Sequence, residues 1–250
     1  MKYTFSANSF IGKRDVNQDS VLVKHATYGK KEILLAIVCD GVGGLYRGEL
    51  ASGMVIKRFN NWFEQNLSIE LEDLNLNKIK DEWICLLKEI NIDLLEYGRK
   101  INKKLGTTFT GTLFIDDQYI FVHVGDTRLY HIGSSIKQLT RDDTIVFKEV
   151  GEGLLTYEQS IVDKRKHALF QCIGSSQNII YQENCLNVEK GVYLLCSDGF
   201  RNKLSTKEIF KNIYSIKYKN DLKKFNEDMI DLLIKRGEKD NISVITIESK

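Results

Sequence analysis

Two pairs of amphipathic helical segments interrupt a series of short apolar runs along the chain. In the first pair, residues 48–67 and 78–103, apolar side chains recur at spacings of three and four. The second pair consists of a short helix opened by a capping box at Ser205 and Glu208 and of residues 221–236, which have the same apolar spacing. This periodicity predicts helices that bury one face. The apolar runs between them have the length of strands. The order therefore predicts sheets packed together with helices outside them, in one domain spanning residues 1–250.

The predicted strands fill much of the remaining chain. They cover residues 21–23 and 33–39, then 107–115, 119–124 and 129–136, then 168–173, 179–187, 192–196 and 242–247. Residues 142–165 have no clear period and are interpreted as short helices and loop. Proline is absent from the chain, so no proline-rich linker marks a domain boundary.

The composition argues against several classes of protein. Lys and Arg number 36 against 34 Asp and Glu, a net charge of +2 that offers no bulk attraction for nucleic acid. The basic stretch Lys217–Lys224 is interpreted as a solvated helix entry, because Tyr218 is its only stacking ring. No apolar run approaches the ~18 residues that span a bilayer, and residues 1–10 lack the apolar segment of a secretory signal. We therefore expect a cytoplasmic protein without a membrane or nucleic-acid partner.

The cysteines and histidines do not form a recognisable metal motif. The five cysteines are widely spaced and include no CxxC pair, so reduced apolar side chains are expected rather than disulfides or a zinc site. The four histidines, His25, His123, His131 and His167, are not arranged as ligands in the sequence.

Five aspartates fall at the ends of the predicted strands. Asp40, Asp126 and Asp198 follow apolar runs, whereas Asp19 and Asp240 come two residues before such runs. Because the end of one antiparallel strand lies beside the start of its neighbour, all five can meet at one rim. A single aspartate at such a position is more often a turn residue, but five together indicate a site.

Clustered carboxylates repel one another unless they take up protons or hold cations. An all-oxygen ligand set favours Mg²⁺ or Mn²⁺ over zinc. Two such ions held close together can activate a water molecule and clamp a phosphoryl group. Arg14, five residues before Asp19, is then a candidate bidentate partner for a phosphate.

An ordered set of motifs from residue 14 to residue 241 covers nearly the whole chain. They are RDVNQDS (14–20), DGVGG (40–44), GELAS (48–52), GTT (106–108), GDTR (125–128), LTRD (139–142), CSDG (196–199) and DN (240–241). The set resembles the PPM family, the PP2C-type metal-dependent serine/threonine phosphatases, in their compact bacterial form. The resemblance implies an α+β fold, a four-layer αββα sandwich of two antiparallel sheets with helix pairs outside.

The resemblance also implies roles for individual residues. Asp40, the Gly41 carbonyl, Asp198 and Asp240 match the ligands of two Mn²⁺ or Mg²⁺ ions, with Asp40 bridging them. Asp19 matches an acidic residue that reaches a metal through water. Arg14 matches the arginine that holds the substrate phosphate. Asp126 and Asp198 match the ligands of a third, weaker ion. Residues 142–170 correspond to a variable flap beside the site.

The implied activity is hydrolysis of phosphoserine and phosphothreonine on proteins by a metal-bridging hydroxide, without a covalent phosphoenzyme. The implied partners are phosphorylated proteins, including a Ser/Thr kinase of the same cell or its substrates, and the implied state is a monomer. The sequence departs from the family pattern at four positions. Val42 replaces a histidine of eukaryotic members, Gln18 replaces a glutamate, Asp143 replaces a usual histidine, and His167 stands in the flap where asparagine is common.

Other functions fit the sequence less well. A cysteine phosphatase needs C-x5-R, but only four residues separate Cys196 from Arg201, and Asp198 between them would repel phosphate. Residues 15–26 resemble a calcium loop but lack its glycine and its final glutamate, and residues 41–46 fail the GxGxxG pattern. The alternative from another class is a non-catalytic phosphoprotein-binding or regulatory module on the same fold.

Overall fold

The chain folds into two sheets flanked by helices, and the computed structural model describes residues 1–215 and 221–250. Residues 217–220 of the basic stretch predicted as a helix entry lie outside the described residues. The strands are β1 (Tyr3–Phe10), β2 (Asp19–Tyr28), β3 (Lys31–Asp40), β4 (Phe109–Ile115), β5 (Gln118–Val124), β6 (Arg128–Ile132), β7 (Ile136–Gln138), β8 (Gln182–Asn187), β9 (Gly191–Cys196) and β10 (Ile242–Ser249). The helices are α1 (Gly48–Gln65), α2 (Leu67–Glu72), α3 (Leu76–Ile101), α4 (Ile145–Gly151), α5 (Tyr157–Val162), α6 (Asp198–Arg201), α7 (Thr206–Ile213) and α8 (Leu222–Lys235).

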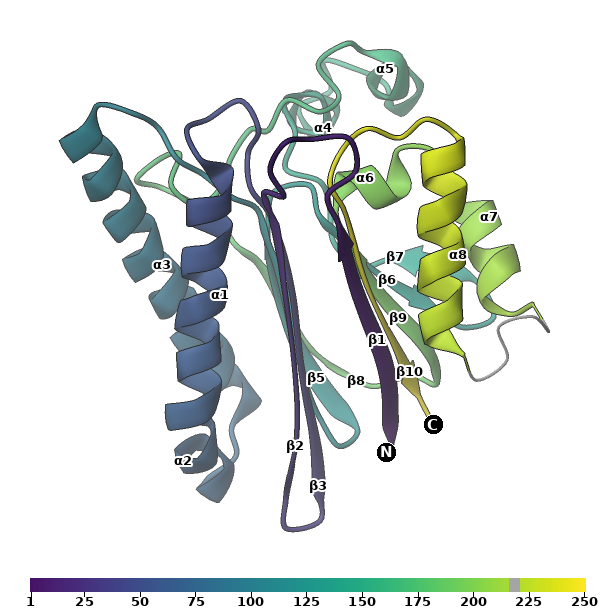
Figure 1. Ribbon diagram of the computed structural model, residues 1–250. Coiled ribbons are helices and arrows are strands. Elements are labelled where there is room, and N and C mark those ends of the chain that lie inside the picture. The colour runs from purple at the N-terminus through teal and green to yellow at the C-terminus, as the bar shows by residue number, and fades with distance from the viewer. Residues whose placement is uncertain (216–220) are drawn as a thin grey trace.

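The two sheets are antiparallel, with five strands each. One has the strand order β1-β10-β9-β6-β7 and the other the order β2-β3-β4-β5-β8. Figure 1 shows α1 and α3 over the outer face of the second sheet and α7 and α8 over the outer face of the first. The predicted αββα sandwich is therefore confirmed. The chain termini lie side by side at the end opposite α4 and α6 (Figure 1).

Three apolar clusters separate the four layers. Between α1, α3 and their sheet, the Phe59 ring packs 5.1 Å from that of Trp83 and 4.8 Å from that of Phe109, centroid to centroid. Between the two sheets, Phe114 lies 4.9 Å from Tyr193. The third cluster buries α7 and α8 against the other sheet. The strands β3 and β4 contribute side chains to two of these clusters, one on each face of their sheet. Their residues are therefore buried on both faces, which explains why these strands are almost continuous apolar runs in the sequence.

The predicted helices agree with the structure apart from their ends. The apolar stripe of residues 48–67 is buried in α1, and that of 78–103 is buried in α3 as far as Leu94, whereas Tyr97 is exposed. The capping box predicted at Ser205 is present, with the Ser205 hydroxyl accepting from the Glu208 backbone N–H. Residues 142–165 contain the short helices α4 and α5, as expected.

Several strand predictions were wrong. Residues 168–173 form no strand and make only isolated bridges at Leu169 and Ile173. The run 129–136 divides into β6 and β7 around a turn, and 179–187 shortens to β8. β1 was not predicted, because as an edge strand it is mostly exposed and its sequence YTFSANSF carries little apolar signal.

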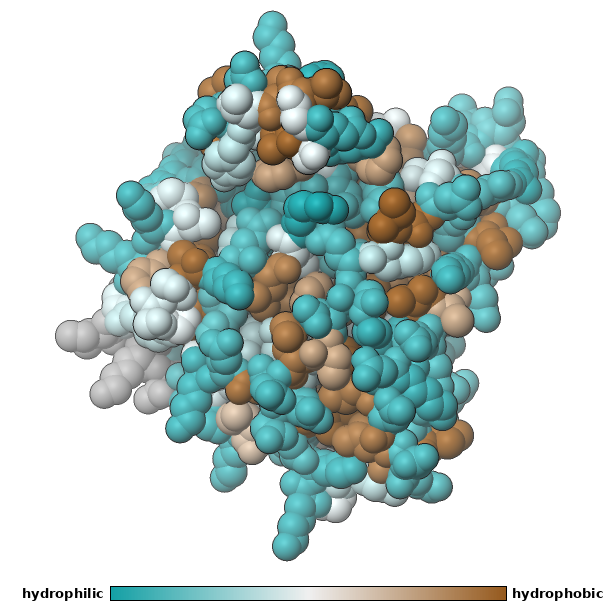
Figure 2. Space-filling model, turned by 180° about the vertical axis from the view of Figure 1, so that it is seen from behind, coloured by the Kyte–Doolittle hydropathy of each residue, from teal (hydrophilic) through white to brown (hydrophobic). Residues whose placement is uncertain are grey.

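The surface is mostly hydrophilic, with hydrophobic side chains in several separate places. Figure 2 shows brown side chains at the upper end of the molecule, where Figure 1 places α5. Leu154, Tyr157, Ile161 and Val162 are all exposed in this segment. Within the described residues, we find no helix whose length and hydropathy would let it span a bilayer.

Candidate metal centre

The predicted aspartates meet at one end of the sandwich. Asp19, the first residue of β2, pairs across the strands with Asp40, the last residue of β3. Asp198 follows β9 and Asp240 precedes β10, which is the antiparallel neighbour of β9. With Asp126, which follows β5, they gather at a cavity of about 450 Å³. Asp40, Asp126, Asp198 and Asp240 line this cavity, while Asp19 is buried behind it.

Burial and mutual repulsion raise the pKa values of four of these carboxyls, those of Asp19, Asp40, Asp126 and Asp198. Burial raises the pKa of Asp40 well above its ordinary value, and Asp19 and Asp198 raise it further. Burial also raises the pKa of Asp19 to about 7, although the hydroxyls of Ser243 and Ser197 donate to its carboxylate and oppose the shift. The Oδ2 atom of Asp19 is buried without a hydrogen-bond partner. Such a cluster of buried oxygens requires protons or cations, and its donor set is the one that Mg²⁺ and Mn²⁺ prefer.

The backbone of Asp40 is held by residues whose roles sequence reasoning missed. The N–H of Asp40 donates to Thr108 Oγ1 at 2.8 Å, and its carbonyl accepts from the Thr108 N–H at 2.8 Å and the Thr107 hydroxyl at 3.0 Å. The next residue must be glycine, since a Cβ at Gly41 would lie 2.5 Å from the Gly48 backbone. These contacts place the Gly41 carbonyl beside Asp40 at the cavity wall.

Arg14 extends into the same cavity from the loop between β1 and β2. Its Nη2 lies 2.8 Å from Asp240 Oδ2, and its side chain is 51 % exposed. Asn241 holds this loop, because its Nδ2 donates to Ile11 O at 2.8 Å and its Oδ1 accepts from the Gln18 N–H at 2.9 Å. The motif DN therefore joins a candidate metal ligand to the residue that positions the arginine loop.

Two half-buried arginines, Arg128 and Arg201, balance negative charge near Asp126. Arg201 Nη2 donates to Asp126 Oδ2 at 3.0 Å, and Arg128 makes a bidentate pair with Asp142 at 2.8 and 2.7 Å. Burial raises the pKa of Asp126 to about 7 in spite of Arg201. Arg128 and Asp142 belong to the quoted motifs, but only the tertiary structure shows that they form an ion-pair network with Arg201, whose guanidinium lies 3.5 Å from Asp142.

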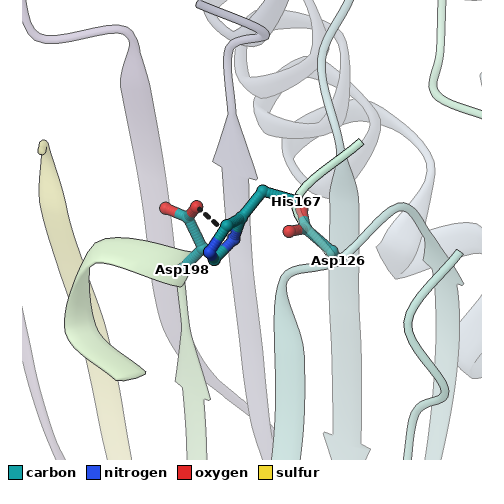
Figure 3. Close-up of side chains that lie close together, drawn as sticks. All are labelled: Asp126, His167 and Asp198. Atoms are coloured by element: carbon teal, nitrogen blue, oxygen red, sulfur yellow. Dashed lines mark ion pairs between the residues drawn. The ribbon is translucent and has the colours of Figure 1, made fainter. Parts of the chain in front are cut away.

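A histidine completes one side of the cavity. Figure 3 shows His167 between Asp126 and Asp198, and its Nδ1 lies 3.8 Å from Asp198 Oδ2. One ligand atom from each of the three residues lies within 4.8 Å of the others, an arrangement that can hold a metal ion. The sequence did not indicate this grouping, because His167 lies in a segment without clear periodicity, far along the chain from Asp126 and Asp198. Burial lowers the pKa of its imidazole, although Asp198 opposes this shift.

Cys196 does not have the environment of a catalytic thiol. Its side chain is fully buried on β9, and burial raises its pKa to about 12, whereas a nucleophilic cysteine needs a lowered pKa. All five cysteines are free, as the sequence predicted.

Comparison with known proteins gives a consistent result. The family model described as Protein phosphatase 2C matches residues 8–239. The chain is 32 % identical over 203 residues to the protein phosphatase PhpP of Streptococcus pneumoniae, covering 79 % of this chain and 78 % of that protein. The solved structure of the S. agalactiae serine/threonine phosphatase superposes with a TM-score of 0.86 at 29 % identity and 100 % coverage of both chains. The catalytic domain of the phosphatase PstP, solved with two manganese ions, superposes with a TM-score of 0.75 at 25 % identity, covering 98 % of this chain and 97 % of that one.

Proposed function

This chain belongs to the protein phosphatase 2C family, and from that premise we propose that it hydrolyses phosphoserine and phosphothreonine on proteins at the acidic cavity. The observation that carries the proposal is the convergence of buried and half-buried carboxylates on a cavity that also receives the guanidinium of Arg14. The named relatives are serine/threonine phosphatases, which favours catalysis over the alternative of a non-catalytic binding module.

The residues of the cavity fit divalent cations. We assign Asp40, Asp198, Asp240 and the Gly41 carbonyl to two Mn²⁺ or Mg²⁺ ions, with Asp40 between them and Asp19 behind as an indirect partner. Asp126 with Asp198 is assigned to a third, weaker ion. When bound, such ions would supply Lewis acidity and an activated water molecule for attack on phosphorus. The unpartnered Oδ2 of Asp19 and the raised pKa of Asp40 support this assignment, because cations would relieve both.

Arg14 and the ends of the strands position the substrate phosphate and the carboxylates of the cavity. Arg14 already points into the cavity, where its guanidinium can donate two parallel N–H bonds to the oxygens of a phosphoryl group. Thr107 and Thr108 fix the Asp40 backbone, so the carboxylate is held before substrate arrives. Holding charges in place in this way is the main source of rate enhancement in phosphoryl transfer.

Partners and compartment follow from the same proposal. The substrates are phosphorylated proteins, among them a Ser/Thr kinase of the same cell or its targets. We assign the chain as a monomer with one phosphatase domain over residues 1–250, in which residues 142–170 form a variable flap. The free cysteines support a cytoplasmic location, where thiols stay reduced.

The test compares hydrolysis of an aryl phosphate and of phosphopeptides by wild type, Asp198→Ala and the exposed control Asp81→Ala. We expect Mn²⁺-dependent activity that EDTA abolishes, retained in Asp81→Ala and lost in Asp198→Ala, with phosphoserine and phosphothreonine peptides preferred over phosphotyrosine. Full activity of Asp198→Ala would overturn the metal mechanism. Absence of Mn²⁺ binding in calorimetry would favour the binding module instead.

A further inference from the structure

We propose that His167 is a protein ligand of the ion bound between Asp126 and Asp198, and that this ion holds the flap against the acidic cavity. The inference builds on the proposed function, since it assumes that divalent cations enter the cavity. It goes further because it assigns a structural role to a metal ion, which would link the flap to the ends of the two sheets.

The three side chains come from separate parts of the fold. Asp126 follows β5, Asp198 opens α6, and His167 lies in the flap after α5 (Figure 3). Two atoms each ~2.1 Å from one cation are ~3.0 Å apart at a right angle and ~4.2 Å apart when opposite. The 3.8 Å between His167 Nδ1 and Asp198 Oδ2 falls in this range and is too long for a hydrogen bond. The three ligand atoms all lie within 4.8 Å of one another, so small side-chain movements would bring them to coordination distance of one ion.

The two carboxylates are held in place by the sheet ends. Arg201 binds Asp126 through Oδ2 and the backbone carbonyl, which leaves Oδ1 as the oxygen that Asp126 offers to a cation. Asp198 begins α6, and the Gly199 that follows packs so closely on the Asn241 carbonyl that a Cβ there would lie 2.0 Å from it. The metal-binding geometry on this side is therefore formed before the flap contributes.

The flap presents His167 through its own hydrogen bonds. The Ala168 N–H donates to Arg165 O at 2.8 Å and its carbonyl accepts from the Ile145 N–H at 2.8 Å, which fixes the segment next to His167. Arg165 in turn makes a bidentate pair with Glu149 on α4, both bonds at 2.8 Å. His167 thus stands at the end of a segment tied to α4, and its side chain is 45 % exposed, so the ring can adjust toward an ion.

The flap otherwise has little apolar attachment to the rest of the protein. Val146 is the one buried hydrophobic residue that α4 and α5 contribute, and Leu154 and Val162 are 68 % and 80 % exposed. A segment with so few buried contacts opens at low free-energy cost. A bond from His167 to the ion would therefore add substantially to the free energy that holds the flap closed.

The imidazole also changes which ion the site prefers. Carboxylates and water alone suit Mg²⁺, whereas an added imidazole nitrogen favours transition metals, with an affinity that rises from Mn²⁺ through Co²⁺ to Ni²⁺. We therefore expect the site of Asp126, His167 and Asp198 to select Mn²⁺ or Co²⁺ over Mg²⁺.

The test uses the full chain as wild type, His167→Ala, His167→Asn and the remote exposed control His25→Asn. Calorimetry with Mn²⁺, Co²⁺ and Mg²⁺ counts the ions and gives their affinities, and hydrogen exchange reports protection of residues 144–170. We expect His167→Ala to weaken the last Mn²⁺ ion by at least the ~10-fold typical of lost support around a metal and to lose metal-induced flap protection. His167→Asn, which keeps an oxygen donor, should bind Mg²⁺ like wild type but lose the Co²⁺ preference. His25→Asn should match wild type.

Two outcomes separate this inference from the proposed function. If wild type hydrolyses substrate with Mn²⁺ but His167→Ala binds the same ions with the same affinity and flap protection, the histidine is not a ligand and only this inference fails. If wild type binds no divalent cation at all, the proposed function fails together with it.

Discussion

The substitution Asp19→Asn should stabilise the metal-free protein while weakening its metal centre. Asp19 is a buried carboxyl opposite Asp40, and its burial raises its pKa from 3.8 to about 7. At neutral pH the folded metal-free protein must either ionise this group against that penalty or take up a proton. An asparagine avoids both costs. Its carbonyl oxygen can still accept from Ser197 and Ser243.

The magnitude follows from the linkage between proton binding and folding. Each tenfold change in an ionisation constant is worth ~1.4 kcal/mol, so a pKa raised from 3.8 to about 7 sets an upper bound of about 4 kcal/mol. Because Asp40 and Asp198 share the proton uptake, we expect about 2 kcal/mol. Between pH 3.8 and about 7 the folded state binds more protons than the unfolded state, so wild-type stability falls as pH rises through this window. The stability of Asp19→Asn should not fall for this reason, because the variant has no carboxyl at position 19 to lose a proton.

Urea unfolding followed by circular dichroism, in EDTA from pH ~4 to pH ~8, measures the difference in the free energy of unfolding between the variant and wild type. The free energy of unfolding of Asp19→Asn should exceed that of wild type by an amount that grows to neutral pH, whereas the exposed control Asp81→Asn should show no such trend. With saturating Mn²⁺ the gain should shrink, because cations relieve the same repulsion in wild type. A variant that is less stable than wild type in EDTA at neutral pH, or a difference independent of pH, would refute the electrostatic reasoning.

Three further predictions concern the site and the core. Arg14→Ala should raise KM and lower kcat/KM by ~10- to 100-fold, with partial recovery in Arg14→Lys; steady-state kinetics that match wild type would remove Arg14 from phosphate binding. Gly199→Ala should cost more than ~3 kcal/mol in thermal unfolding and weaken Mn²⁺ binding, because the new Cβ would meet the Asn241 carbonyl at 2.0 Å. Phe59→Ala should cost ~3–5 kcal/mol in urea unfolding through the cavity it leaves, while the folded fraction keeps its kcat; an unchanged unfolding midpoint would contradict the packing described here.

Local sequence patterns predicted most of the architecture. The helices were found because α1 and α3 each bury one stripe, and β3 because its run is apolar throughout. The gathering of aspartates was predictable as well, because antiparallel pairing places a strand end beside a neighbouring strand start. The failures have an equally local cause. β1 is an edge strand with polar residues, and residues 168–173 are apolar without forming a ladder.

The residues along the chain were enough to predict that carboxylates would converge at one rim and that oxygen-preferring cations would suit them. Both inferences need only the positions of strand ends, the rules of antiparallel pairing and the chemistry of the ligand atoms. The surroundings of that rim, in contrast, became known only from the folded arrangement of distant segments. Arg201 reaches Asp126 across 75 positions of the chain, and His167 comes from a segment without regular periodicity to stand beside Asp198. Such contacts depend on how loops pack against finished sheets, and no spacing in the sequence encodes them.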